Sequence, residues 1–144
     1  ALDVTVQAQI MELLHELQTD TGMGLILITH DLGVVAEVCD RVVVMYAGEI
    51  MEDGEINDVY HHPAHPYTLG LMDSIPRTDM HTDRLTPIQG APPDLLNIPS
   101  GCPFHPRCPF VQERCTKDQP TPVNIGRDSH ESSCFYWEEV QRDR

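Results

Sequence analysis

The twelve prolines of this 144-residue chain are confined to one part of it, since the first is Pro63. Proline has no backbone N–H and a fixed φ angle, so it is excluded from helix interiors and from central strands. The residues before Pro63 can therefore form regular helices and strands, whereas those after it must be broken into turns, short helices and extended segments. This contrast predicts two regions, residues 1–62 and 63–144.

The first region begins with alternating helix and strand patterns. Apolar residues at helical spacing predict an amphipathic helix over residues 3–21, with Asp3 as its N-cap. The continuous apolar run Leu25–Thr29 predicts a strand buried on both faces of a parallel sheet. Asp31 is then expected to cap a second helix over residues 32–39.

A hairpin is expected next in this region. The valine-rich residues 41–46 and residues 49–52 flank Ala47-Gly48, which suits a tight turn, and a short helix is expected over residues 55–60. Helices and strands that alternate in this way are typical of the α/β class. They are too few to close a complete sheet, so we expect the chain to be a piece of a longer protein.

Beyond Pro63 the expected structure is mostly irregular. Pro66 suits the first turn of a helix that Pro76 ends, and the proline-punctuated residues 77–100 are expected to be extended. The stretch HHPAHPY, residues 61–67, has the composition of a metal-binding tract. We interpret it instead as a structural or docking turn.

The charge of the chain excludes nucleic acid as a partner. Asp and Glu number 23 against 9 Lys and Arg, which gives a net charge of −14. Binding to nucleic acid depends mainly on neutralising phosphates with Lys and Arg, and binding to anionic lipid depends on the same residues. No apolar run is long enough to span a bilayer.

His30 follows the expected strand directly and is the first candidate site residue. The carboxyl ends of parallel strands face the crevice in which α/β proteins bind ligands. A neutral imidazole at that place can donate a hydrogen bond to a phosphate oxygen. Position alone, however, favours a histidine that has no ligand.

Four of the five cysteines crowd the C-terminal third with the spacing C-x5-C-x6-C-x18-C; they are Cys102, Cys108, Cys115 and Cys134. No secretion signal is visible, and clustered cysteines then favour metal binding over disulfides. Four thiolates are the ligand set of an iron–sulfur cluster, and the spacing differs from the paired CxxC motifs of zinc ribbons. Zinc, disulfides and free thiols remain the alternatives.

Three other side chains are weaker candidates. His105 and His130 lie near the cysteines in the sequence and would favour zinc if either replaced a thiolate. Because four cysteines already complete a ligand set, we expect both histidines to pack or hydrogen-bond instead. Cys39 lies on the apolar second helix, where a buried structural thiol is expected.

Short motifs of the first region resemble the ATP-binding subunits of ABC transporters. Ala-Leu-Asp at residues 1–3, followed by a helix, is similar to the D-loop of that family. Thr-His-Asp at residues 29–31 is similar to the run that holds the switch histidine. The strand of residues 41–45 and Gly-Glu-Ile at residues 48–50 are similar to the hairpin that follows, and the order and spacing match throughout.

The second region resembles the C-terminal extension of the oligopeptide/dipeptide importer branch. The similarity is carried by His-Pro-Tyr-Thr at residues 65–68, by Pro-Ile-Gln-Gly-Ala-Pro-Pro at residues 87–93 and by the block from Gly101 to Pro109. Subunits of that branch power the uptake of short peptides, and sometimes of nickel or other solutes, delivered by an external binding protein.

The resemblance implies an α/β fold: the C-terminal half of an ABC-type P-loop nucleotide-binding domain in residues 1–62, followed by an irregular Pro/Cys-rich extension in residues 63–144. His30 would contact the γ-phosphate of ATP, which binds with Mg²⁺ mostly through motifs outside this sequence. Asp3 would lie at the interface with a second ATP-binding subunit, identical or different. The four clustered cysteines would hold a [4Fe-4S] cluster.

The same resemblance implies partners and a location. The implied partners are two membrane permease subunits and, indirectly, an extracytoplasmic peptide-binding protein. The implied location is peripheral, on the cytoplasmic face of the membrane. The sequence departs from the family in lacking a Walker A loop, a Q-loop, a signature sequence and a Walker B strand. Residues 1–144 alone are therefore expected to be inactive. The alternative is a free-standing iron–sulfur or zinc module, structural or redox, without ATPase activity.

Overall fold

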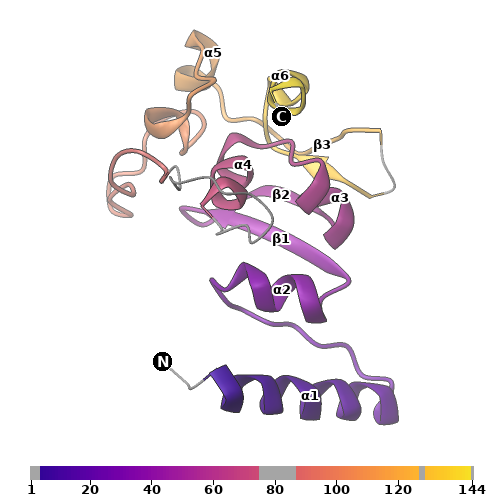
Figure 1. Cartoon of the computed structure of the whole chain (residues 1–144). Coiled ribbons are helices and arrows are strands. Elements are labelled where there is room, and N and C mark those ends of the chain that lie inside the picture. The colour runs from indigo at the N-terminus through magenta and orange to yellow at the C-terminus, as the bar shows by residue number, and fades with distance from the viewer. Residues whose placement is uncertain (1–3, 75–86, 127–128, 144) are drawn as a thin grey trace, which may run out of the picture. The chain divides into compact units, whose positions relative to one another are not determined.

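The computed structural model describes residues 4–74, 87–126 and 129–143. The chain divides into two compact units, Ala1–Cys39 and Asp40–Arg144, and each is described by itself. Figure 1 shows the elements of both units.

The first unit contains the two expected helices. Helix α1 spans Val4–Thr21 and ends at Gly22, whose positive φ of 68° suits a glycine after a helix. Helix α2 spans Leu32–Val38, and the side chain of Asp31 accepts hydrogen bonds from the N–H groups of Gly33 and Val34, which confirms the expected cap. Asp3, the expected cap of α1, lies outside the described residues.

The expected strand over Leu25–Thr29 is not formed, and these residues have no regular structure. Ile26 is 91% exposed and Ile28 is 95% exposed, so the apolar run is not buried either. A strand is stable only beside a hydrogen-bonded partner, and the described part of the first unit has no second strand. The prediction of a strand in a parallel sheet is therefore wrong for this structure.

The second unit is built on an antiparallel sheet. Strands β1 (Arg41–Tyr46) and β2 (Glu49–Glu55) form the expected hairpin, and β2 is three residues longer than predicted. Ala47 and Gly48 have φ angles of 50° and 84°, which is the left-handed pair required by the tight turn. The short strands β4 (Glu131–Ser132) and β3 (Val123–Asn124) complete the order β1-β2-β4-β3.

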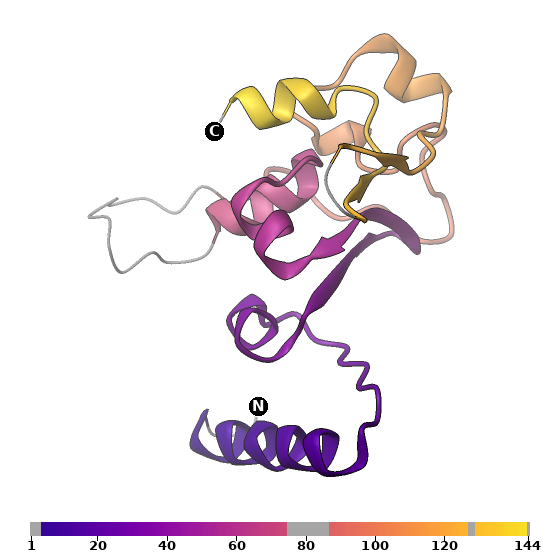
Figure 2. The same ribbon diagram turned by 90° about the vertical axis from the view of Figure 1, so that its right-hand side faces the viewer.

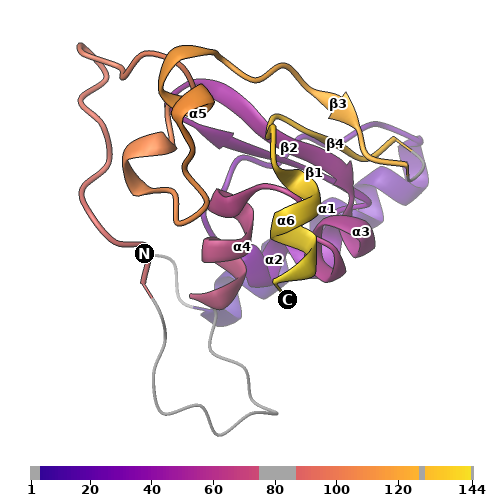
Figure 3. The same ribbon diagram turned by 90° about the horizontal axis from the view of Figure 1, so that it is seen from above.

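Short helices of the second unit accompany this sheet, and sequence patterns predicted two of them. The helices after the hairpin are α3 (Ile56–His61) and α4 (Pro66–Asp73), and α4 has proline at its start as expected. The 3-10 helix η1 (His105–Arg107) and helices α5 (Glu113–Lys117) and α6 (Trp137–Arg142) were not predicted. Figures 2 and 3 show α6 beside α4 on one side of the sheet, where Gln141 of α6 also donates a hydrogen bond to the carbonyl of His62.

The core of the second unit joins the hairpin to the cysteine-rich segment. Tyr46 and Met51 from the two strands are buried together with Phe104. The rings of Tyr46 and Phe104 meet edge to face with centroids 5.2 Å apart, a favourable aromatic geometry. Cys102 and Cys115 belong to the same buried cluster, so the cysteine-rich segment packs directly on the sheet.

A buried carboxyl group ties three segments of the second unit together. Glu52 on β2 is fully buried, and its two oxygens accept hydrogen bonds from the N–H groups of Ala64 (2.8 Å) and His65 (2.9 Å). Nε2 of His130, also fully buried, lies 2.8 Å from Oε1 of Glu52. Burial of a carboxyl group is tolerable only with such partners.

No helix within residues 4–74, 87–126 and 129–143 is both long enough and apolar enough to cross a membrane.

The packing around Glu52 gives a stability prediction. A Cβ added at Gly54 would lie 3.0 Å from both Cδ2 of His130 and Cγ2 of Val59. We expect Gly54→Ala to lower the free energy of unfolding by about 1–3 kcal/mol, because the ring of His130 must move. Chemical denaturation measures this free energy of unfolding. Gly24→Ala is the matched control, since open space surrounds that position; equal stability loss in both variants would contradict the expectation.

Candidate functional site

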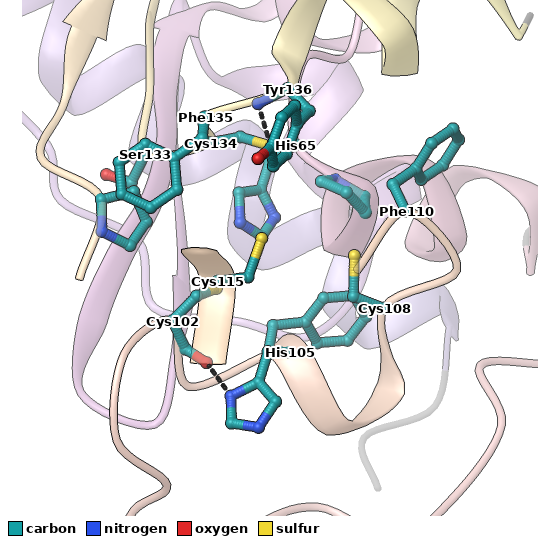
Figure 4. Close-up of a pocket in the computed structure, with 13 residues that line it drawn as sticks. His65, Cys102, His105, Cys108, Phe110, Cys115, Ser133, Cys134, Phe135 and Tyr136 are labelled. Atoms are coloured by element: carbon teal, nitrogen blue, oxygen red, sulfur yellow. Dashed lines mark hydrogen bonds between the residues drawn. The ribbon is translucent and has the colours of Figure 1, made fainter. Parts of the chain in front are cut away.

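The four clustered cysteines of the sequence line one cavity, which Figure 4 shows. Cys102 and Cys108 flank η1, Cys115 lies in α5, and Cys134 follows β4. The cavity is small, with a volume of about 10 Å³. The structure therefore brings together side chains that are up to 32 positions apart in the sequence.

Backbone hydrogen bonds set the positions of these cysteines. The N–H of Cys102 donates to the carbonyl of Cys115 over 2.9 Å. Gly101 has a φ of 71°, and a Cβ there would lie 2.3 Å from the carbonyl oxygen of Cys115. Only glycine fits this close approach of the two backbone segments.

Backbone N–H groups lower the pKa of three of the four thiols, in a repeated local pattern. In each case a donor is the aromatic residue two positions after the cysteine; the pairs are Phe104 to Cys102, Phe110 to Cys108, and Tyr136 to Cys134, and the N–H of His105 acts on Cys102 as well. The bond from Tyr136 to Cys134 measures 3.4 Å. Each N–H stabilises negative charge on its sulfur. In two cases the intervening residue is proline, Pro103 or Pro109, which has no N–H of its own.

The thiols are nevertheless difficult to ionise as they stand. Burial raises the pKa of Cys108 to about 12 and that of Cys134 to about 12, and burial also raises the pKa of Cys102. Negative charge on the neighbouring cysteines raises these pKa values further. A group of buried thiols that oppose one another's ionisation becomes a group of thiolates only when a cation compensates their charge.

The side chains do not form a finished ligand set. Among residues 4–74, 87–126 and 129–143, no three or more His, Cys, Asp or Glu side chains are arranged so that they could hold a metal ion. The residue types, the shared cavity and the N–H groups directed at sulfur fit a thiolate-bound group, whereas the present side-chain arrangement does not coordinate one.

Two histidines line this cavity together with the cysteines, His65 and His105, and His65 is the one that is fully buried. It is 1% exposed, it caps α4, and its Nδ1 accepts the N–H of Tyr67 over 3.1 Å. Burial lowers its pKa to about 3, so the imidazole is neutral at physiological pH. The HHPAHPY stretch singled out from sequence thus contributes a helix cap and one wall of the cavity.

The other two histidines near the cysteines do not point at the sulfurs. The Nδ1 of His105 donates to the carbonyl of Cys102 over 2.9 Å, and Figure 4 shows its ring turned away from the sulfur atoms. His130 is paired with Glu52 and is not among the residues that line the cavity. Cys39 is half-buried at the C-cap of α2, more exposed than expected.

The candidates of the first region lie elsewhere in the chain. His30 is exposed at the bend directly before the cap of α2, where the N–H of Asp31 donates to Oγ1 of Thr29 over 3.0 Å. An exposed imidazole at the start of a helix is free to meet a ligand. Asp3 lies outside the described residues, so its expected place at a subunit interface stays a prediction.

Comparison with known proteins gives relatives along nearly the whole chain. Residues 51–115 match the family described as the oligopeptide/dipeptide transporter C-terminal region. The oligopeptide transport ATP-binding protein OppD of Haemophilus influenzae is 58% identical over 115 residues, covering 80% of this chain and 36% of that protein. The dipeptide transport ATP-binding protein DppD of Bacillus subtilis is 53% identical over 142 residues, covering 99% of this chain and 42% of that protein.

A third relative, the oligopeptide transport ATP-binding protein OppD of Salmonella typhimurium, is 54% identical over 120 residues, or 83% of this chain and 36% of its own length. Residues 51–115 therefore belong to the oligopeptide/dipeptide transporter C-terminal region, and nearly the whole chain is similar to ATP-binding proteins named for that transport, as the motifs predicted. It spans about two fifths of the length of the curated relatives it matches.

The close approach at Gly101 gives a prediction for the cysteine cavity. We expect Gly101→Ala to lower the free energy of unfolding by about 3 kcal/mol, because the new Cβ would force Cys102 away from Cys115. Urea denaturation measures this loss. Gly126→Ala is the control, since Gly126 has a similar φ of 85° but open space around it. If both variants lose the same stability, backbone strain alone explains the effect.

Proposed function

We propose that this chain is the C-terminal part of an ATP-binding subunit that powers import of oligopeptides or dipeptides. The observation that carries the proposal is the identity of about one half, or more, with proteins named for oligopeptide and dipeptide transport. Residues 1–62 would complete an ABC-type nucleotide-binding domain, and residues 63–144 would form the extension of the peptide-importer branch.

In the full-length subunit, His30 would act on the γ-phosphate of ATP. Phosphoryl transfer depends mainly on positioning and on stabilisation of charge. The imidazole would orient the phosphate or the attacking water, whereas Mg²⁺ and most of the nucleotide would be held by motifs outside this sequence. The exposure of His30 directly before a capped helix supports this role, because the ring is accessible to a ligand.

Asp3 would contribute to the interface between two ATP-binding subunits, which could be identical or different. The further partners in this proposal are two membrane permeases and, indirectly, an extracytoplasmic peptide-binding protein. The subunit would then sit peripherally on the cytoplasmic face of the membrane. The net charge of −14 supports contact with protein partners rather than with anionic lipid.

The cysteine cavity would hold a [4Fe-4S] cluster. This proposal is supported by the four cysteines that line one cavity and by the backbone N–H groups that favour negative charge on three of their sulfurs; the cysteines are Cys102, Cys108, Cys115 and Cys134. A bound cluster supplies positive charge that compensates four thiolates and covalently connects the segments that carry them. We assign it a structural role, because residues 87–122 contain few buried apolar side chains of their own.

The role of His30 gives a kinetic prediction. In the full-length subunit, we expect His30→Ala to lower the rate of ATP hydrolysis by about 100-fold or more, because a group that orients transition-state charge is lost. His15→Ala on the exposed face of α1 is the matched control and should hydrolyse ATP normally. A phosphate-release assay measures both, and near-normal turnover by His30→Ala would refute the assigned role.

The metal content gives a second prediction. Protein purified without oxygen should contain about four iron and about four sulfide per chain and absorb visible light. Replacing Cys115 by alanine should abolish most of this content, whereas Cys39→Ala should leave it unchanged, because Cys39 does not line the cavity. About one zinc per chain without sulfide would instead identify a zinc site, and the absence of both metals would overturn the proposed metal centre.

A further inference from the structure

The imidazole of His65 is held in one place by its own backbone. Glu52 is fully buried and accepts the N–H groups of both Ala64 and His65, so the start of α4 is attached to β2. Pro66 follows as the first residue of that helix and restricts the backbone further. The ring therefore projects from a rigid support rather than from a loose loop.

The hydrogen bonds of the ring determine which nitrogen carries the proton. Nδ1 lies 3.1 Å from the N–H of Tyr67 and accepts its hydrogen, so Nδ1 itself carries no proton. A neutral imidazole has a single N–H, which must then be on Nε2. His65 cannot be a metal ligand through Nε2 in this state, because that nitrogen has no free lone pair.

The remaining face of the ring meets the cysteines. His65 lines the same cavity as the four cysteines, and Figure 4 shows its imidazole reaching towards the sulfur of Cys115. A buried N–H without an acceptor costs about 1–3 kcal/mol, so it is expected to find one. The rest of the lining is mainly proline and aromatic side chains, with Ser133, Tyr136 and His105 as the other residues that carry acceptor atoms, so the four sulfurs are the most numerous acceptors.

We infer that His65 is a positioning residue that directs its Nε2–H at the sulfurs of the cysteine cavity and stabilises their negative charge. This inference rests on the proposed metal centre and adds a side-chain donor to the backbone donors at residues 104, 110 and 136. Hydrogen bonds to the sulfurs of a cluster favour its more negative, reduced state and raise its reduction potential. Glu52 acts through His65, since it fixes the backbone that carries the ring.

Two substitutions separate the cap from the donor. His65→Asn retains an acceptor near Nδ1 that can cap α4, but it loses the N–H that reaches the cavity. His65→Gln places an amide N–H near the position of Nε2 and loses the cap. His105→Asn is the matched control, because the ring of His105 is turned away from the sulfurs.

The experiment measures iron and sulfide per chain and then the reduction potential of the anaerobically reconstituted protein, for wild type and all three variants. We expect a more negative potential in His65→Asn, a potential near that of wild type in His65→Gln, and no change in His105→Asn. Nitrogen-15 shifts of the His65 ring, measured by NMR on wild type, should show a protonated Nε2 and an unprotonated Nδ1.

The outcomes separate the inference from the proposal beneath it. A wild-type protein that takes up no iron overturns the metal centre and, with it, the role of His65. A cluster whose potential is the same in wild type and His65→Asn overturns the role of His65 alone. If His65→Asn fails to fold, a protonated Nδ1 in the NMR spectrum of the wild-type protein would still overturn the inferred role of His65.

Discussion

The second unit depends on one buried carboxyl group. Glu52 sits in the middle of β2 with no exposure to solvent, and every partner that satisfies it comes from another segment. Two backbone N–H groups before α4 and the ring of His130 converge on its oxygens. Because a buried carboxyl group is costly without these partners, the hairpin, the helix and the C-terminal strands are stable only together.

Local sequence signals predicted the local parts of this fold. The cap at Asp31, the proline in the first turn of α4 and the turn at Ala47-Gly48 are decided by a few neighbouring residues, and all of them appear in the structure. The run Leu25–Thr29 has the composition of a buried strand but remains irregular, since a strand is decided by its partner as much as by its own residues. Non-local pairing is the part of a fold that composition does not encode.

The candidate site was predictable in its residues but not in its surroundings. The cysteine spacing identified the four thiols, and the structure gathers them at one cavity. Sequence reasoning did not find the N–H donors to sulfur, although the repeat Cys-Pro-Phe at residues 102–104 and 108–110 carries the signal. It also treated His65 only as part of a turn. A histidine directly before a proline that begins a helix is a capping pattern, and a capping ring has a defined tautomer.

The cysteine cavity lies between β2, with the residues bonded to it, and the proline-rich segment. His65 and Cys134 are attached to β2, the latter through the bond from Ser133 N–H to the carbonyl of Met51 over 2.8 Å. Cys102 and Cys115 are instead bonded to each other within the proline-rich segment. A group that bonds sulfurs from both sides closes a covalent loop and reduces the entropy of the unfolded chain. Loss of the bound group would let the proline-rich segment open as a separate cooperative unit while the hairpin stays intact. The rate of local opening in that segment would then show whether the cysteine cavity is occupied.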